Sequence, residues 1–495
     1  MNQEQSYLAL LTPEQMQRIE RKHIDAGTPS FDLMMQAGES VAAFIRSTFA
    51  PAPILVLTGP GNNGGDGYVI AESLRVAGWE VTLASFTHTA PRTPDAILAH
   101  NFYHGDVVEY SADLLANMPM IVDAIFGTGL TKSLDAKIVQ AISDIESRNL
   151  PVIAVDIPSG VHGETGAVLG AAFKAAATMT FTRKKIGHTV LPGKEYCGTV
   201  LVADIGIPDT LVIEENPGVF QNEPELWIKH LRQPDSGTHK YMRGHVGVLG
   251  GIRTMTGASR LSALAAQRSG AGLVSVVCNE DTLPVLAPAL TSIMTVLANT
   301  EEEYAAWLKD ERITSLVIGP GAGVNDRTRA FVKASLDSGK ATVIDADAIS
   351  AFAGNAESLK TMLHPQCILT PHEGEFERLF KNTPVSEKST KLEKTLEAAR
   401  WIGATVAYKG SDTIIASPEG IAVVNVNAPP TLATAGSGDV LAGICGGLLA
   451  QGIPAFDAAC AAVWMHGEAA LMFGVGLIAD DLNDTLPDVL RFLQE

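Results

Sequence analysis

A glycine- and asparagine-rich loop at residues 59–67 has the residue types of an anion-binding site. Its sequence, GPGNNGGDG, follows an apolar run directly and leads into a helix that we expect to begin near Asp66. Free backbone N–H groups at the start of a helix bind anions, and Asn62 and Asn63 add amide donors and carbonyl acceptors. Because the pattern differs from GxGxxG, it predicts a nucleotide-phosphate site rather than the ordinary dinucleotide fingerprint. A solvent-facing glycine turn is the alternative.

Two aspartates stand where later apolar runs end. Asp123 lies in MIVDAIFGTGL and Asp156 in VIAVDIPSG, each before a glycine-containing turn. Ligands bind at the carboxyl edge of open α/β sheets, so we expect both carboxylates to point into the same crevice. Together with Asn63 and Ser159 they would form an oxygen-rich site for a monovalent or divalent cation. The alternative is that these acids cap helices or accept backbone N–H groups.

A second glycine turn lies near the C-terminal end of the chain, in TLATAGSGDVLAGICGGLLA. Free N–H groups at Gly436 to Gly438 and a carboxylate at Asp439, in the first helical turn, predict an anion hole with a base beside it. In AYKGSDTII, Lys409 ends a strand before a tight turn at Gly410, a good position for a cation on the phosphates of an adenine nucleotide. A helix-dipole role for Asp439 and a solvated Lys409 are the alternatives.

Short apolar runs separated by helix-length segments predict the elements that position the first loop and the two strand-end acids. Two helix signals, Thr12-Pro13-Glu14 and Thr28-Pro29, precede the first of these runs. This alternation is typical of a parallel sheet in a Rossmann-like α/β domain. The expected strands are residues 54–58, 81–86, 120–125 and 152–157.

The alternation stops between Ile205 and Gly237, where GIPDTLVIEENPGVFQNEPELW has three prolines and an acidic bias. A linker or surface crossover is expected there, so we divide the chain into domains of residues 1–218 and 219–495. Beyond it a second, larger α/β domain is expected, which ends in strongly apolar helices. Its strands are expected in GHVGVLGG, LVSVV, SLVIGPG, ATVIDAD, CILTPHEGE and TVAYKG.

The composition narrows the class of partner. With 36 Lys and Arg against 55 Asp and Glu, and a formal net charge of -19, the chain is not suited to neutralise nucleic-acid phosphates, so a small-molecule ligand is expected. The most apolar stretch, residues 441–479, contains Pro454, Asp457, His466 and Glu468, which argues against a membrane span. No signal-peptide pattern opens the chain, and five scattered cysteines without CxxC spacing predict reduced core residues. A cytoplasmic protein is expected.

The first half resembles the NAD(P)H-hydrate epimerase family over roughly residues 10 to 214. The motifs that carry the resemblance are GNNGGDG, DAIFGTGL, DIPSG and KIGHTVLPGKEYCGTVLVADIGIP. Members interconvert the R and S forms of a hemiaminal made by addition of water at nicotinamide carbon 6. The resemblance implies that Asn63, Asp123 and Ser159 bind potassium. It also implies that the substrate is held by Asn62, Asn63, Gly64, Gly65, Asp66, Gly127, Thr128, Gly129, Leu130, Thr131, Lys132, Ser133 and Asp156.

Asp156 is the residue that we expect to act on the substrate in this half. The resemblance places its carboxylate against the reacting ring. Inversion of a hemiaminal centre requires proton transfer to and from the leaving hydroxyl or the ring nitrogen. Asp156 is therefore our candidate catalytic residue, and loss of R/S equilibration in Asp156→Ala would test it.

The second half resembles the ribokinase-like superfamily and, within it, the NAD(P)H-hydrate dehydratases over roughly residues 225 to 494. HKYMRGHVGVLGG, GAGLV, VIGPGAG, DADAI, LTPHEGE and AGSGDVLAG occur in the same order. The resemblance implies that the aspartate of the GxGD turn, Asp439, is catalytic and that phosphorylation of the hydroxyl precedes its elimination. It assigns Ala258, Gly323, His372 and Asp439 to the hydrate, and Lys409, Gly410, Ser411, Asp412, Thr413 and Gly438 to the nucleotide.

The same resemblance implies ADP or ATP as co-substrate, with Mg²⁺ bridging the phosphates. Bacterial-type members use ADP and others ATP. Two stretches depart from the family pattern. Glu373 stands in TPHEGE where a proline is usual, and residues 427–434 replace a Gly-Asn-Pro-Gly turn.

The sequence thus predicts an α/β chain with a Rossmann-like epimerase domain followed by a ribokinase-like dehydratase domain, acting on hydrated NADH and NADPH (NADHX and NADPHX). We also expect a homo-oligomer, with a tetramer among the options. One alternative is a ribokinase-like small-molecule kinase with a non-catalytic N-terminal binding domain, because GSGD alone marks the whole superfamily. Another is a scaffold role for the N-terminal domain, against which Asn63, Asp123 and Asp156 argue.

Overall fold

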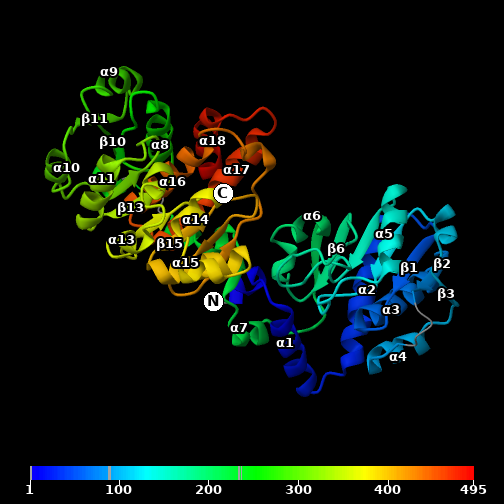
Figure 1. Ribbon diagram of the computed structural model, residues 1–495. Helices are drawn as coiled ribbons and strands as arrows, with labels where there is room; N and C mark the ends of the chain where they lie inside the picture. Colours follow the sequence, from blue (N-terminus) through cyan, green and yellow to red (C-terminus); the bar gives the residue numbers. More distant parts are fainter. Residues whose placement is uncertain (1–2, 87–90, 232–234, 236, 495) are drawn as a thin grey trace. The chain divides into compact units, whose positions relative to one another are not determined.

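The chain packs into two compact units, Met1–Val219 and Phe220–Glu495 (Figure 1). The computed structural model describes residues 3–86, 91–231, 235 and 237–494. The division between the units falls one residue after the boundary predicted from the sequence. Each unit is built around its own sheet.

The first unit contains a seven-stranded sheet in which neighbouring strands are parallel. The four predicted runs all form strands, which confirms the α/β fold expected of this half. Three further strands, β3, β6 and β7, were not predicted. In sheet order the strands are β3 (Val107–Glu109), β2 (Val81–Ser85), β1 (Ile54–Thr58), β4 (Ile121–Ala124), β5 (Val152–Val155), β6 (Ala177–Phe181) and β7 (Thr199–Ala203).

Two α-helices precede β1, as the helix signals predict. The first begins with a capping box, in which the Thr12 hydroxyl accepts from the N–H of Gln15 and the Gln15 side chain accepts from the N–H of Thr12. The last helix of the unit lies inside the stretch expected to be a linker, so that stretch is partly structured. The helices are α1 (Pro13–Asp25), α2 (Ser30–Thr48), α3 (Asn62–Val76), α4 (Pro94–Phe102), α5 (Ala136–Ser147), α6 (Gly193–Cys197) and α7 (Asp209–Glu215).

The helix after the glycine-rich loop begins at Asn62, four residues earlier than predicted. Two glycines explain the early start. A Cβ at Gly64 would lie 1.9 Å from the carbonyl oxygen of Gly59, and a Cβ at Gly59 would lie 2.0 Å from that of Ile125. Because both positions lack side chains, the chain leaves β1 and turns into α3 almost at once. Asn62 and Asn63 therefore lie in the first helical turn.

The core of the first unit forms between its sheet and its helices. Ile138 and Ala141 of α5 are buried in a cluster that also contains Leu55 and Leu57 of β1. Helix α3 packs on β1, β2 and β4, and α2 and α4 pack against α3. This packing fixes the carboxyl ends of β1, β4 and β5, where the candidate site residues lie.

The second unit contains a ten-stranded sheet. The seven strands β11, β10, β9, β12, β13, β14 and β15, in sheet order, pair in parallel. Strand β16 pairs antiparallel with β15 on one side and with β17 on the other. The six predicted strands are all present. Strands β8, β11, β16 and β17 were not predicted. In sheet order the strands are β11 (Met294–Leu297), β10 (Leu273–Cys278), β9 (His245–Leu249), β12 (Ser315–Ile318), β13 (Ala341–Ile344), β14 (Cys367–Leu369), β15 (Thr405–Tyr408), β16 (Ile414–Ala416), β17 (Ala422–Val424) and β8 (Val219–Gln221).

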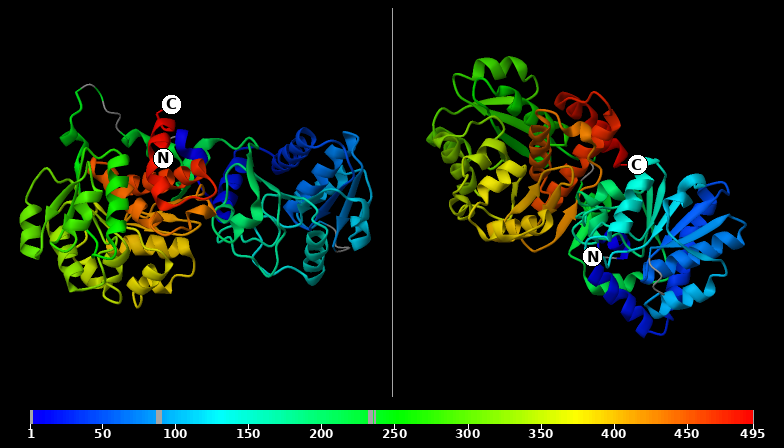
Figure 2. Two further views of the ribbon diagram at one scale, coloured as in Figure 1. Left: turned by 90° about the horizontal axis from the view of Figure 1, so that it is seen from above. Right: turned by 45° about the vertical axis from the view of Figure 1, so that its right-hand side comes forward.

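Helices cover both faces of this second sheet (Figure 2). Helix α16 packs on β9, β12 and β13, α8 packs against α16, and α17 packs on β14 to β16. The α-helices are α8 (Thr256–Arg268), α9 (Leu283–Leu286), α10 (Glu301–Trp307), α11 (Asp326–Asp337), α12 (Ala346–Ser350), α13 (Ala356–Lys360), α14 (Glu373–Leu379), α15 (Lys391–Ile402), α16 (Ser437–Ala450), α17 (Ala455–Phe473) and α18 (Ala479–Phe492).

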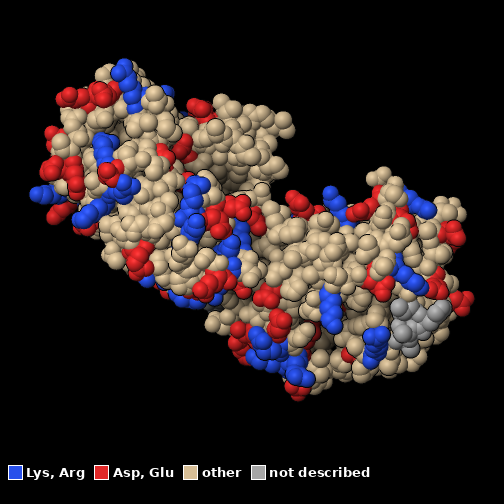
Figure 3. Space-filling view, viewed as in Figure 1, with Lys and Arg blue, Asp and Glu red and all other residues tan. Residues whose placement is uncertain are grey.

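The five cysteines are free and buried, as predicted. Within the described part of the chain, no helix is both long and apolar enough to cross a membrane. On the face shown in Figure 3, Lys and Arg side chains are interspersed with Asp and Glu.

Candidate functional site

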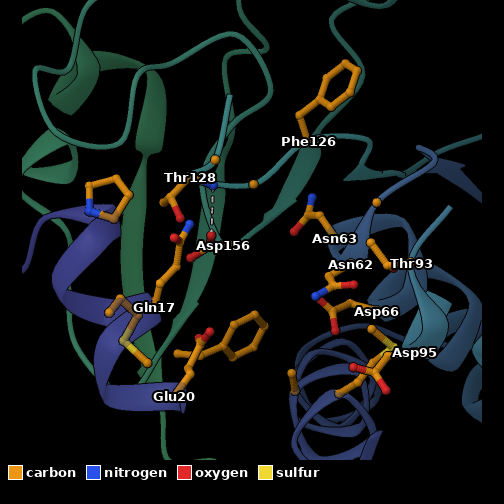
Figure 4. Close-up of a pocket in the computed structure, with 18 of the residues that line it drawn as sticks. Gln17, Glu20, Asn62, Asn63, Asp66, Thr93, Asp95, Phe126, Thr128 and Asp156 are labelled. Carbon is orange, nitrogen blue, oxygen red and sulfur yellow. Dashed lines mark hydrogen bonds between the residues drawn. The ribbon is translucent and has the colours of Figure 1, made fainter. Parts of the chain in front are cut away.

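A cavity of about 670 Å³ opens at the carboxyl ends of β1, β4 and β5 in the first unit (Figure 4). Most of the residues predicted to hold a ligand in this half line it. These are Asn62, Asn63, Asp66, Gly127, Thr128, Gly129, Leu130, Thr131, Lys132 and Asp156. Helix α1 forms another wall, which the sequence did not predict. Its lining residues are Pro13, Met16, Gln17, Glu20 and Ile24.

Asp156 follows the last residue of β5 and has a left-handed backbone, with φ of 65°. Such a conformation is costly for a residue with a side chain and is typical of functional sites. Both carboxylate oxygens already accept hydrogen bonds. Oδ2 accepts from the N–H of Thr128 at 3.0 Å, and Oδ1 accepts from the Thr180 hydroxyl at 2.9 Å and from Lys185 Nζ at 3.0 Å. The carboxylate is therefore held in one orientation beside the cavity.

Lys185 and His188 lie beside this aspartate, and the Lys185 ammonium keeps its carboxylate ionised. Burial acts to raise the pKa of Asp156, but the Lys185 ammonium and the Thr128 N–H outweigh it and lower that pKa below its ordinary value. His188 donates from Nε2 to the Asp156 carbonyl oxygen at 2.8 Å and accepts at Nδ1 from the N–H of Lys185 at 2.8 Å. Burial, followed by the Lys185 charge, lowers the pKa of His188 to about 4. At neutral pH the site thus contains an ionised Asp156 and a neutral imidazole.

Asp123 does not point into the cavity, contrary to the prediction. Its side chain is fully buried, and it accepts hydrogen bonds at 2.6 Å from the Ser159 hydroxyl and at 2.7 Å from the Ser159 N–H. The reason is that the chain turns sharply after β5 and brings Ser159 directly over the end of β4. Burial raises the pKa of Asp123 to about 6 against these hydrogen bonds. Among the described residues no Lys, Arg or His forms an ion pair with it.

Asn63 and Asp156 converge on one point of the cavity wall. A Cβ at Gly127 would lie 2.9 Å from Asp156 Oδ2 and 3.2 Å from Asn63 Oδ1. The other side-chain atom of Asn63, Nδ2, is buried and has no hydrogen-bond partner in the described structure. The three predicted potassium ligands are therefore only partly brought together. Asp123 and Ser159 hydrogen-bond to each other, whereas Asn63 lies at the cavity.

Three residues predicted to hold the substrate are not among those that line the cavity. Gly64 packs against the backbone of Gly59, and Gly65 faces the Met34 side chain on α2, where a Cβ would approach it to 2.6 Å. The nearest atoms to a Cβ at Gly170 are those of Ser133, at 3.8 Å, so Ser133 faces that neighbouring loop. Gly64 and Gly65 therefore allow close packing at the start of α3.

Two further carboxyl groups face the cavity without partners. Glu20 of α1 and Asp66 of α3 have no hydrogen bond or ion pair among the described residues, and both line the cavity. Burial, with the charges of Asp156 and Glu20, raises the pKa of Asp66 well above its usual range. Burial also raises the pKa of Glu20, with Lys185 opposing and Asp156 adding to the effect. The site thus combines one ionised carboxylate with two carboxyl groups that take up a proton readily.

In the second unit, the predicted glycine turn forms the amino end of α16. Gly436 is the N-cap, with a φ of 90°, and Asp439 lies in the first turn. Lys409 follows the last residue of β15, and its Nζ would lie 3.4 Å from a Cβ at Gly438. A lysine ammonium and the free N–H groups of a helix start therefore meet at one place, which is the chemistry of a phosphate site.

The sequence did not predict the partner of Lys409. Its Nζ forms an ion pair at 2.8 Å with Oδ1 of Asp345, which follows β13 and is 1% exposed. Thr370 donates a hydrogen bond to the same oxygen at 2.8 Å. Burial acts to lower the pKa of Lys409, but the charges of Asp345 and Glu375 outweigh it and raise that pKa. Lys409 is thus a half-buried, charged lysine held by an ion pair rather than a fully solvated one.

Asp439 lies in the field of this cluster. Burial, followed by the charge of Asp345, raises the pKa of Asp439 to about 6, and Lys409 only partly opposes the effect. The charge of Asp347 adds to the upward shift of the Asp439 pKa. Burial also raises the pKa of Glu375, which neighbours Lys409 and Asp345. An aspartate with a pKa near 6 is mostly ionised at neutral pH and is still basic enough to take a proton.

The other predicted residues of this half lie in turns around the same edge of the sheet. His372 is the N-cap of α14, where Nδ1 accepts from the N–H of Glu375 at 3.3 Å. The N–H of Gly323 donates to Oδ2 of Asp347 at 2.8 Å. Ala258, in the first turns of α8, would meet a Cβ at Gly321 at 3.2 Å.

The predicted nucleotide residues after Lys409 form the turn between β15 and β16. The N–H of Gly410 donates to the Thr413 hydroxyl at 3.1 Å, and Ser411 is exposed in the middle of the turn. Asp412 is buried and accepts from Lys391 Nζ at 2.6 Å. Lys391 stands at the start of α15, so the turn is anchored to a neighbouring helix.

Comparisons with known proteins cover both halves. A family model described as NAD(P)H-hydrate dehydratase matches residues 246–487, and one described as YjeF-related protein N-terminus matches residues 30–187. A protein of Salinibacter ruber named bifunctional NAD(P)H-hydrate repair enzyme is 34% identical over 97% of this chain and 96% of its own. A protein of the same name from Escherichia coli is 32% identical over 97% of this chain and 93% of its own.

Solved structures are similar to part of the chain. The ADP/ATP-dependent NAD(P)H-hydrate dehydratase of Bacillus subtilis, co-crystallised with ATP and Mg²⁺, is 27% identical and covers 55% of this chain and 98% of its own, with a TM-score of 0.48. A ribokinase-like superfamily protein of Enterococcus faecalis is 26% identical and covers 56% of this chain and 96% of its own, with a TM-score of 0.49.

Proposed function

The chain belongs to the bifunctional NAD(P)H-hydrate repair enzymes, and we propose that each of its two units holds one of the two activities. The enzyme epimerises the R and S forms of NADHX and NADPHX and dehydrates the S form to NADH or NADPH at the expense of ADP or ATP. Epimerisation is assigned to the cavity of the first unit. Dehydration is assigned to the GSGD turn of the second.

The pinned carboxylate of Asp156 is the observation that supports the epimerase assignment most strongly. Its strained backbone and three hydrogen-bond donors hold a negative charge against a cavity that would bury the nicotinamide end of a dinucleotide. A fixed anion stabilises positive charge that develops on the ring when the C6 hydroxyl departs. The first turn of α3 and the loop from Gly127 to Ser133 would hold the rest of the dinucleotide.

Potassium would be held by Asn63, Asp123 and Ser159. Asp123 is a fully buried carboxylate with hydrogen bonds but no cationic partner among the described residues, and a bound cation would compensate its charge. The amide of Asn63 has a buried atom without a partner, and it can turn to offer its oxygen. The donor set is all oxygen, as alkali cations prefer. The cation would fix the loop after β4 against Asp123.

In the second unit, Asp439 would remove the proton from the C6 hydroxyl as it attacks the terminal phosphoryl group. The N–H groups of Gly436 to Gly438 would stabilise the transferring charge, and Lys409 would bind the phosphates of the nucleotide. The phosphorylated hydroxyl then leaves C6 as phosphate, and loss of a proton from C5 to solvent forms the C5=C6 bond that restores the dihydronicotinamide ring. ADP or ATP is the donor. When bound, Mg²⁺ would supply positive charge that neutralises the nucleotide phosphates, and the described residues offer no cluster of three His, Cys, Asp or Glu side chains to hold it.

A single assay on the whole protein tests both assignments. Mixed R and S hydrate is supplied with ADP, and the absorbance of the reduced nicotinamide is followed. Complete recovery requires both activities, whereas recovery of only the S fraction means that the first unit does not epimerise. A stable phosphorylated product in place of free phosphate would instead identify a small-molecule kinase.

Two further predictions concern the protein in the cell. We expect it to be cytoplasmic and to form a homo-oligomer, with a tetramer among the options. Light scattering coupled to size-exclusion chromatography would give the mass of the assembly, against 52.2 kDa for one chain.

A further inference from the structure

Helix α1 contributes one face to the epimerase cavity, and none of the residues assigned to the substrate or to potassium lies on this helix. Pro13, Met16, Gln17, Glu20 and Ile24 recur at the spacing of neighbours on one side of a helix. Figure 4 shows Gln17 and Glu20 projecting from this helix on the same side of the cavity as Asp156, with Asp66 and Asn62 on the opposite side. Glu20 is the only acid that α1 presents to the cavity within the described structure.

The proton chemistry of the reaction needs a group other than Asp156. The Thr128 N–H donates to Oδ2 of Asp156, and Lys185 Nζ and the Thr180 hydroxyl both donate to Oδ1, so each carboxylate oxygen already accepts a hydrogen bond from the protein. A carboxylate saturated by donors and paired with a buried ammonium, 2% exposed, is held as an anion. Such a group stabilises positive charge well but exchanges protons poorly.

Glu20 has the opposite surroundings. It is partly buried, it lines the cavity, and no hydrogen bond or ion pair engages its carboxyl group among the described residues. The charged and titratable groups that face it are Lys185 and Asp156 from the sheet side and Asp66 from α3. Its proton is favoured by burial and by the negative charge of Asp156, so its pKa is raised from the ordinary value of a glutamate.

We propose that Glu20 is the catalytic acid and base of the epimerisation, which rests on the assignment of the epimerase to this cavity. The protonated carboxyl group of Glu20 donates its proton to the C6 hydroxyl, the C6–O bond breaks, and water leaves. The lone pair of ring nitrogen N1 forms the C6=N1 bond, and the resulting iminium cation lies against the anionic Asp156. Water then adds to the other face of C6, and its proton returns to Glu20. One water leaves and one water adds, so the step consumes no co-reactant.

The test measures equilibration of pure S hydrate in the absence of ADP by chromatographic separation of the two epimers. Glu20→Gln keeps the shape and polarity of the side chain but cannot exchange a proton. We expect kcat to fall about 100-fold with KM within about twofold, and we expect the alkaline limb of the wild-type pH profile to disappear. Glu14→Gln is the matched control, because Glu14 lies on the exposed side of the same helix. This variant should epimerise the hydrate at the wild-type rate.

Glu20→Asp separates a catalytic role from a structural one. It keeps a carboxyl group, so it should retain activity within about tenfold of the wild type and keep the alkaline limb. Wild-type equilibration by Glu20→Gln, or equal losses in the Gln and Asp variants, would overturn the proposal. So would loss of activity in Asp66→Asn with Glu20→Gln unaffected, since the proton would then belong to Asp66. Absence of epimerisation by the wild-type protein would instead refute the proposed function of the first unit, while dehydration of the S form reports separately on the second.

Discussion

The two units use an aspartate in contrasting ways at corresponding edges of their sheets. Asp156 accepts from three donors, one of them a buried ammonium, and its pKa is held below the ordinary value. Asp439 lies at the start of a helix with other acids nearby, and its pKa is raised to about 6. The first is built to remain an anion, and the second is built to gain and lose a proton.

The position of a neighbouring lysine contributes to the contrast in pKa between the two aspartates. Lys185 bonds directly to the carboxylate of Asp156, whereas Lys409 bonds to Asp345, and the Asp439 side chain has no ion-pair partner among the residues that the structure describes. Burial, followed by the negative charge of Asp345, then favours the protonated form of Asp439. Two similar motifs, an aspartate after a strand or in a glycine turn, therefore acquire different chemistry from residues that lie far away in the sequence.

The largest expected effect is the loss of dehydration in Asp439→Asn. Removal of a general base costs on the order of 10³-fold in rate, so recovery of NADPH from S hydrate with ADP should fall by about that factor. Equilibration of the epimers should be unchanged. Asp480→Asn is the matched control, because Asp480 is an exposed acid in the first turn of α18. If both variants lost the same small amount of activity, Asp439 would serve only the helix dipole.

The second prediction concerns the ion pair between Lys185 and Asp156. Lys185→Met leaves a buried carboxylate without its ammonium, so the free energy of unfolding of the first unit should fall by about 3–5 kcal/mol and epimerisation by about 100-fold. Lys22→Met, at an exposed position of α1, should change neither. The double variant with Asp156→Asn should regain stability without regaining activity. An independent, additive loss in the double variant would show that the two side chains do not act as a pair.

The third prediction concerns pH, for which the two activities should respond with opposite signs. Asp439 must be ionised to accept a proton, so dehydration should fall about tenfold per pH unit below pH 6. Asp156 remains ionised throughout this range, so its titration should not lower the epimerisation rate at acid pH. Epimerisation should instead fall at higher pH, where Glu20 loses its proton. Initial rates of both reactions, measured on the same preparation from about pH 5 to pH 9, would refute the contrast if they fell together.

The sequence predicted much of the fold because hydrophobic runs and turn residues are local signals. Strands β1 and β9 were read from such runs, whereas the short strands β3 and β16 have only three residues each and no clear alternation. The start of α3 was misplaced because the close approach of Gly59 and Gly64 is a contact that spacing alone does not reveal. Periodicity locates an element better than it locates its first residue.

The candidate site was predicted less completely, for a physical reason. Its motifs identified Asp156 and Asp439 as strand-end and helix-start acids, but the groups that set their charge lie elsewhere in the chain. Lys185 is 29 residues from Asp156, and Asp345 is 64 residues from Lys409. Both partners stand in sequence motifs, KIGH and DADAI, whose residue types alone do not reveal which acid or lysine they contact. Contacts between side chains on different strands can be identified only once the order and register of the strands are known.

The smallest expected effect concerns Glu373, which departs from the family pattern beside the cluster at Asp439. Glu373 is the first residue of α14 and is exposed, and the side chain that caps this helix is that of His372. Proline is well tolerated at the first position of a helix, since that N–H has no partner within the helix. Glu373→Pro should therefore change the free energy of unfolding by less than about 0.5 kcal/mol and the dehydration rate by less than about twofold. Thermal unfolding and the ADP-dependent assay would measure both. A larger loss of activity would mean that the charge at this position reaches Asp439, so the acidic cluster that sets its pKa would extend to the protein surface.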